Sequence, residues 1–230
     1  MAQTKRKTEE GKTNMNINLQ LFGGRGASAG GGDLGSSAGE NINYTEKGDL
    51  MSLSETNFRN NIMDTIKDFQ DDNPDLFNDG IVVKEIVADT KSTALAFWGE
   101  DGTLALNSKY DDAKAMDTAY AQCEKEGFHP SRGNKTAEQA VMAHELGHSL
   151  TSLAVKKQNM SFDEISKKII REATAEAKTK NAKKFALNIS EYAKKSNAEC
   201  IAEAVADVYC NGSKAKAESH IVVNTLRKYI

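Results

Sequence analysis

Two histidines four residues apart set the first condition on the fold of this chain. They enclose the five-residue motif His144-Glu145-Leu146-Gly147-His148. On an α-helix of about 3.6 residues per turn, positions four apart share one face, so both imidazoles can bind the same cation. Glu145 projects beside them. The H-E-x-x-H pattern therefore predicts a metal site that the rest of the chain builds and covers.

The residues around the motif favour a helix. Thr136 followed by Gln139 is the pattern of a capping box, and Val141 and Leu150 supply apolar contacts along the next turns. Gly147 needs a packing reason, because glycine inside a helix costs about 1 kcal/mol relative to alanine. Close approach of another backbone to this helix is one such reason.

The alternative is a helix that carries two histidines by chance, one of them in the core, with Glu145 as a surface charge. The chain of 230 residues has only four histidines, and two of them fall at the required spacing around a glutamate. We therefore favour the metal site.

Composition excludes several classes of protein. The net charge of -3 gives no field that would attract nucleic acid or a membrane surface. Three cysteines, at positions 123, 200 and 210, lack C-x-x-C spacing, so we expect free thiols rather than disulfides or a cysteine zinc site. No apolar run is long enough to span a membrane, and the amino terminus lacks the apolar segment of a signal peptide. We expect a cytoplasmic location or one in a phage particle.

Residues 1–50 form a leader rich in glycine and serine, which we expect to be disordered, and residues 51–230 form one domain. The island Ile17–Phe22 alternates apolar and polar residues, as a short strand or a docking peptide does, although an apolar patch in a tail fits equally well. The segment Leu19–Gly26 resembles the start of many phage and prophage head-associated proteins. That resemblance implies an origin and possible phage-particle partners, and says nothing of chemistry.

The pattern of elements predicts an α+β fold with a small sheet, an active-site helix and an all-helical carboxyl-terminal part. Strands are expected at 81–87, 93–98 and 103–107, the last two joined by a short turn at 99–102. Helices are expected at 54–70, 113–126, from Thr136 onward, from Ser161 to about Phe185, at 196–209 and at 217–230. His129 lies in a segment broken by glycine and proline, and we interpret it as a non-ligand that can line the cleft.

A catalytic zinc ion takes three protein ligands, so the two histidines need one more donor. No third histidine follows the motif at metzincin spacing, which favours a carboxylate. Glu199, Glu203 and Asp207 lie one turn apart on one helix face. Spacing alone leaves two choices open: Glu199 as ligand, or Glu199 in a Ser196 capping box with Glu203 as ligand and Asp207 behind a ligand histidine.

The motif, together with Tyr192 and the segment Asn197–Ala204, resembles the catalytic domain family of anthrax lethal factor, over about 95 residues from the motif helix to the carboxyl terminus. The resemblance implies a zincin-like fold, with Glu199 as the third zinc ligand, Glu203 as the carboxylate behind a ligand, and Tyr192 as a hydroxyl near the reacting carbonyl. Cys200 and Ile201 stand where that family tends to carry aromatic residues, so the resemblance does not imply the shape of the cleft.

These residues predict a zinc-dependent endopeptidase, in which Glu145 accepts a proton from a metal-activated water. A peptide substrate is expected to pair with an edge strand, for which 103–107 is our candidate. Tyr192 is expected to stabilise the oxyanion; packing is the alternative for that side chain. The alternative function is a structural or interaction protein of a phage particle that keeps a metallopeptidase-like fold and a structural zinc. A toxin acting on a host protein would share the chemistry of the endopeptidase.

Overall fold

The structure is a computed structural model that describes residues 45–47, 56–78, 85–87, 95–99, 103–106 and 113–230. The Ile17–Phe22 island, the Leu19–Gly26 segment and residues 100–102 of the expected turn lie outside the described residues. So does the leader, except for Thr45–Lys47, which forms a strand.

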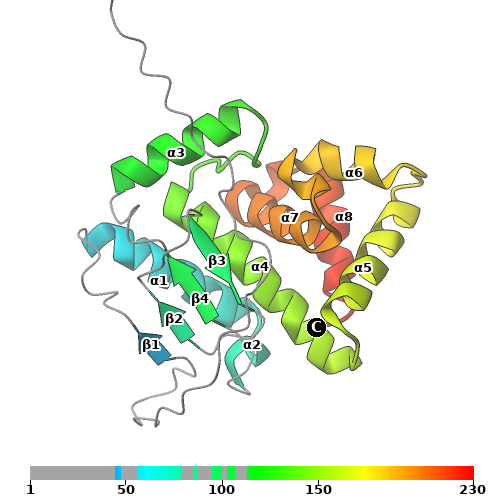
Figure 1. The fold of residues 1–230 in the computed structure, drawn as a ribbon, viewed down its shortest axis with the longest axis horizontal. Helices are drawn as coiled ribbons and strands as arrows, with labels where there is room; N and C mark the ends of the chain where they lie inside the picture. Colours follow the sequence, from blue (N-terminus) through cyan, green and yellow to red (C-terminus); the bar gives the residue numbers. More distant parts are fainter. Residues whose placement is uncertain (1–44, 48–55, 79–84, 88–94, 100–102, 107–112) are drawn as a thin grey trace, which may run out of the picture.

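Helices dominate the described chain (Figure 1). The α-helices are α1 (Thr56–Asp72), α2 (Asp75–Asn78), α3 (Ala113–Lys125), α4 (Ala137–Gln158), α5 (Phe162–Glu176), α6 (Ala182–Ile189), α7 (Asn197–Asn211) and α8 (Ala217–Leu226). Two 3₁₀ turns, η3 (Tyr192–Lys194) and η4 (Gly212–Lys214), precede and follow α7. None of the helices in the described ranges combines the length and the apolar composition needed to cross a membrane.

Short strands pair beside the helices, in the order β1-β2-β4-β3 within the described part of the chain. They are β1 (Thr45–Lys47), β2 (Glu85–Val87), β3 (Ala96–Trp98) and β4 (Thr103–Leu106). β1 pairs with β2 and β2 with β4 in parallel, whereas β3 and β4 are antiparallel. The predicted antiparallel pair is therefore confirmed. The predicted edge strand is wrong, because β4 lies between β2 and β3.

The predicted α+β class is also wrong. Helices account for most of the described chain, so the fold is essentially all-helical. The physical reason is the length of the strands, which have only three or four residues each. Strands this short add few side chains to the core, and most of the buried apolar residues come from helices. The apolar runs that indicated a sheet layer are real strands, but they do not build a layer comparable to the helices.

α4 runs through the centre of the described molecule, between the strands with α1 on one side and α5 and α7 on the other (Figure 1). Every residue from Ala140 to Thr151 is buried, so this helix has no solvated face along its middle turns. A side-chain methyl group at Gly147 would lie 2.8 Å from the Cα atom of Ala202 on α7. The glycine is thus explained by the close approach of α7 to α4.

Capping pairs stand at the starts of α4 and α5. The Gln139 side chain accepts the Thr136 backbone N–H at 3.1 Å where α4 begins. Ser161 and Glu164 form a reciprocal box at α5: the Ser161 hydroxyl accepts the Glu164 N–H, and the Glu164 carboxylate accepts the Ser161 N–H at 2.9 Å.

The helix expected from Ser161 to about Phe185 is in fact two helices, α5 and α6. Lys178 has a left-handed φ of 53°, which ends the helical backbone hydrogen bonding. A new helix then begins where the Asn181 side chain accepts the Lys184 N–H at 2.9 Å. Residues 178–181 contain neither proline nor glycine, which is why the sequence pattern indicated one helix.

Candidate metal centre

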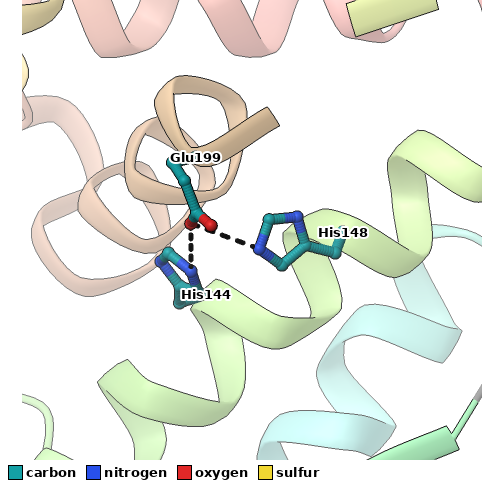
Figure 2. A group of neighbouring side chains, drawn as sticks. All are labelled: His144, His148 and Glu199. Carbon is teal, nitrogen blue, oxygen red and sulfur yellow. Dashed lines mark ion pairs between the residues drawn. The ribbon is translucent and has the colours of Figure 1, made fainter. Parts of the chain in front are cut away.

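His144 and His148 lie one turn apart on α4 and face α7 (Figure 2). Their ring centroids are 5.0 Å apart, and both side chains are buried. The four-residue spacing places them on one face, as the motif predicts. Two neutral imidazoles held this way form half of a tetrahedral zinc site.

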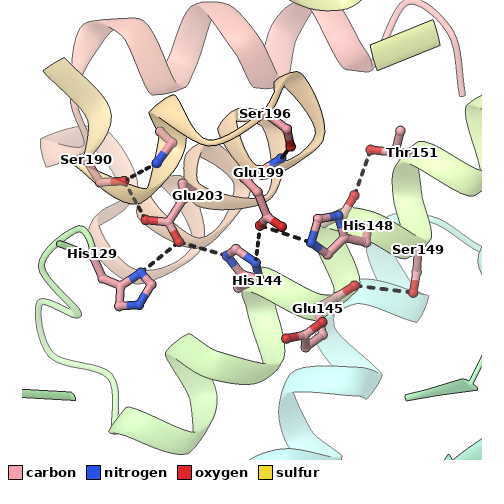
Figure 3. A network of polar contacts seen from close by, with 12 residues as sticks. His129, His144, Glu145, His148, Ser149, Thr151, Ser190, Ser196, Glu199 and Glu203 are labelled. Carbon is pink, nitrogen blue, oxygen red and sulfur yellow. Dashed lines mark hydrogen bonds and ion pairs between the residues drawn. The ribbon is translucent and has the colours of Figure 1, made fainter. Parts of the chain in front are cut away.

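Glu199 approaches both histidines from the first turn of α7 (Figure 2). Its Oε2 atom lies 3.1 Å from His144 Nε2 and 3.4 Å from His148 Nε2. The Ser196 hydroxyl accepts the backbone N–H of Glu199 at 3.1 Å and so caps α7. The carboxylate of Glu199 points to the histidines (Figure 3), so Ser196 contributes a one-sided cap and leaves this carboxylate available as a ligand.

The donor set and its spacing fit zinc. The candidate ligand atoms of His144, His148 and Glu199 all lie within 4.8 Å of one another, and all three side chains are buried. Two ligand atoms about 2.1 Å from a tetrahedral zinc ion lie about 3.4 Å apart, which is close to the separations of 3.1 and 3.4 Å between Glu199 and the two histidines. Two nitrogens and one oxygen are also a set that zinc takes in catalytic sites.

The carboxylates of Glu199 and Glu203 favour a positive charge on His144. Burial disfavours a charged imidazole, but the hydrogen bonds and charges of Glu199 and Glu203 outweigh it and raise the pKa of His144 to about 10. Despite burial, the two histidines hold the pKa of Glu199 well below its usual range. A bound cation would supply the positive charge that the second proton of His144 otherwise provides between the two carboxylates.

Glu203 lies behind His144, on the side away from Glu199 (Figure 3). Its Oε1 atom lies 2.8 Å from His144 Nδ1, and its Oε2 atom accepts the Ser190 hydroxyl at 2.7 Å. Burial alone would raise the pKa of Glu203, but the charge and hydrogen bond of His129, together with His144, lower it to about 2. An ionised carboxylate only accepts hydrogen bonds, so His144 donates from Nδ1 and presents Nε2 to the metal position.

His129 was interpreted from the sequence as a non-ligand, and its contact with Glu203 was not predicted. Its Nδ1 atom lies 2.9 Å from the same Glu203 Oε1 atom that His144 contacts. The residue comes from the segment between α3 and α4, 74 positions from Glu203. No local spacing signals this contact, because the chain brings the two residues together only when the segment folds against α7.

Glu145, the central acid of the motif, is almost fully buried. Its Oε1 atom has no hydrogen-bond partner among the described residues. Burial raises the pKa of Glu145 to about 7; the charges of Glu199 and Glu203 add to this effect, and those of His144 and His148 oppose it. A carboxylate with this pKa can take up and release a proton near neutral pH.

Tyr192 lies in η3, with its ring next to that of His144. Its ring centroid is 5.9 Å from that of His144 and 5.2 Å from that of Phe128. Burial, followed by the charges of Glu199, Glu145 and Glu203, holds the pKa of Tyr192 well above its usual range. The phenol therefore remains a hydrogen-bond donor at neutral pH.

Asp207, the third acid of the α7 face, is engaged elsewhere. Its Oδ2 atom accepts the Lys216 backbone N–H at 2.9 Å and the Ser219 hydroxyl at 2.6 Å. Asn211 donates to the other oxygen at 2.8 Å. Asp207 thus connects α7 to the start of α8, and the arrangement with Asp207 behind a ligand histidine does not occur.

Trp98 of the edge strand β3 packs over the site. Its ring centroid is 5.8 Å from that of His148 and 5.1 Å from that of Phe162 on α5. The indole is buried. No protein family, curated protein or solved structure matches this chain.

Proposed function

We propose that this chain is a zinc-dependent endopeptidase that hydrolyses peptide bonds with a metal-activated water. His144, His148 and Glu199 would hold the ion, and Glu203 would orient His144. The observation that carries the proposal is Glu145, a buried carboxylate with a pKa of about 7 and an unpartnered oxygen, next to a His/His/Glu cluster. A merely structural zinc site has no need of such an acid.

The chain's own residues supply the proton transfers. When bound, zinc polarises the scissile carbonyl and makes a water nucleophilic near neutral pH. Glu145, which is buried next to His144 and has an unpartnered oxygen among the described residues, would accept a proton from the attacking water and deliver it to the leaving amine. Tyr192 donates a hydrogen bond to the developing oxyanion, a contribution of about 3 kcal/mol for one well-placed donor.

We propose β3 as the strand that a peptide substrate pairs with. β3 is an edge of the sheet, and its Trp98 ring contacts the ring of His148. An extended peptide that adds to this edge would run beside the metal ligands. The substrates we propose are proteins or peptides, and the net charge of -3 gives no support for nucleic acid.

We infer an origin in a phage or another mobile element from the Leu19–Gly26 segment. Its resemblance to the start of phage head-associated proteins supports a location in a phage particle or in the cytoplasm, with particle components as partners. The resemblance of Tyr192, Glu199 and Glu203 to the lethal factor catalytic family supports the proposed protease class.

The test of the proposal is the variant Glu145→Gln, compared with the unchanged chain in a peptide-library cleavage assay. We expect about one zinc ion per chain in both proteins, and loss of cleavage in the variant alone. Zinc binding without cleavage in the unchanged chain, and equal behaviour of the variant, would favour the phage structural protein instead.

A second pair of variants tests the ligand assignment. Glu199→Ala should lose zinc, whereas Glu203→Ala should keep it with an affinity about 10–100 times lower. Metal analysis after gel filtration measures both. Zinc retained by Glu199→Ala and lost by Glu203→Ala would reverse the assignment.

A further inference from the structure

Glu203 is the centre of a buried hydrogen-bond network that extends beyond the metal ligands (Figure 3). Its Oε1 atom contacts two imidazoles, His144 Nδ1 at 2.8 Å and His129 Nδ1 at 2.9 Å, and its Oε2 atom contacts the Ser190 hydroxyl at 2.7 Å. The side chains of His129, His144 and Glu203 are at most 1% exposed. Because these groups are shielded from water, each hydrogen bond to the Glu203 carboxylate is strong and helps to fix its position.

A glutamate has three side-chain torsions, so it needs contacts of its own before it can orient a histidine. Among the described residues, the ion pairs of Glu203 are with His129 and His144 alone. His144 is the ligand that Glu203 would orient, so it cannot also hold Glu203 in place. His129 is the other imidazole in contact with the Glu203 carboxylate and can hold it from the side away from His144. Ser190 holds the other oxygen.

His129 is itself held firmly. Its ring stacks on Tyr120 with centroids 5.7 Å apart and meets Phe128 edge-on at 4.9 Å. The backbone before it is joined to the start of η3, where Glu191 N–H donates to Gly127 at 3.0 Å and Tyr192 N–H donates to Phe128 at 3.1 Å. Both aromatic packing and backbone hydrogen bonds therefore fix the position of its Nδ1 atom.

We propose that His129 is a positioning residue of the metal site, which fixes Glu203 and through it the tautomer and orientation of His144. This inference rests on the proposed zinc site. The network then runs from His129 through Glu203 to His144 and ends at the metal position. A group bonded to a ligand histidine, as Glu203 would be, typically changes metal affinity 10–100-fold when it is removed, and His129 acts on the ligand through this group.

A purely structural role for His129 predicts a different result. If the ring only fills space among Tyr120, Phe128 and Tyr192, an aromatic ring without a donor should replace it at no loss of metal affinity. His129→Phe keeps an aromatic ring and removes the donor. His129→Asn removes the ring but keeps an N–H at the position of Nδ1. The two variants therefore separate packing from hydrogen bonding.

The experiment measures zinc affinity by competition with a chromophoric chelator, after thermal unfolding has established that each metal-free variant is folded. We expect His129→Phe to bind zinc about 10–100 times more weakly than the unchanged chain, and His129→Asn to remain within about threefold. His220→Phe on α8 is the matched control and should leave the affinity unchanged. Ser190→Ala, which removes the donor to the other oxygen of Glu203, should also weaken binding, and it tests the network if His129→Phe does not fold.

Equal affinity of folded His129→Phe and the unchanged chain would overturn the inference, as would weakening by His129→Asn as large as that by His129→Phe. An unchanged Ser190→Ala affinity would count against the network as well. Absence of cleavage by a zinc-loaded chain would overturn the proposed protease function alone, because these affinities do not depend on catalysis. A chain that binds no zinc would overturn both.

Discussion

A hydrogen atom in place of a methyl group at position 147 allows α7 to approach α4 closely enough for Glu199 to meet the histidines. The nearest backbone atom to an added Cβ would be Ala202 Cα, at 2.8 Å, and a backbone atom cannot move aside as a flexible side chain can. The side chain of Val205 would lie at 3.2 Å. The separation of α4 and α7, which carry the candidate metal ligands, therefore depends on this residue.

We predict that Gly147→Ala destabilises the protein by about 1–3 kcal/mol. Helix propensity alone predicts the opposite sign, a gain of about 1 kcal/mol, so the sign of the change decides between the two effects. Urea unfolding measures it, with Ser152→Ala on the same helix as a control for general sensitivity. A more stable Gly147→Ala protein would show that α7 can move away from α4 at little cost.

At the scale of elements, the start of α7 determines where Glu199 lies. Ser196 caps this helix through the N–H of Glu199 itself, whereas Ser161 caps α5 through the N–H of Glu164, which is not a candidate ligand. The two serines make the same kind of contact at two helices, so they form a matched pair.

We predict that Ser196→Ala and Ser161→Ala each lower the free energy of unfolding by about 1 kcal/mol, which denaturant titration measures. Zinc affinity should fall in Ser196→Ala alone, because only that cap fixes the residue that carries a ligand. Equal zinc affinities in the two variants would mean that packing of α7 against α4 positions Glu199 without the cap.

The elements also show what local sequence can and cannot predict. Helix starts at Thr136, Ser161 and Ser196 were predicted because capping acts within a few residues. The break at Lys178 was missed, since no proline or glycine marks this left-handed residue in the sequence. The contact of His129 with Glu203 spans 74 positions, and local rules carry no information over that distance. The α+β class was wrong because short apolar runs do not reveal how small a sheet they form.

At the scale of the whole molecule, a bound ion should stabilise the fold by mass action. Zinc at about 100 times its dissociation constant adds about 2.7 kcal/mol, which raises Tm by about 5–10 °C for a chain of this size. We expect a chelator to reverse this shift, and calorimetry with and without zinc measures it. Glu145→Gln should keep the shift and Glu199→Ala should lose it. A shift that survives in Glu199→Ala would place the zinc elsewhere.

The three cysteines give a pH-dependent readout of the core. Burial raises the pKa of Cys123, Cys200 and Cys210 to about 12 each, from an ordinary value of about 9. At pH 8 the folded protein should therefore resist iodoacetamide, and all three thiols should react once it unfolds. As pH rises above about 9, the unfolded chain loses these protons first, so the free energy of unfolding should fall between pH 9 and 12. Mass spectrometry of the alkylated protein and urea midpoints at pH 7 and 10 test this. Rapid labelling of the folded protein would contradict it.

The uninterrupted burial of α4 from Ala140 to Thr151 has a consequence for dynamics. A segment surrounded by the strands, α1, α5 and α7 cannot meet solvent unless its neighbours separate. Amide protons in these turns should exchange with deuterium only through opening of the entire domain, whereas the exposed first turn of α6 should exchange early. His144 and His148 would then lie in the slowest-exchanging part of the protein, and any motion needed to admit a substrate to the proposed site would have to come from the surrounding elements.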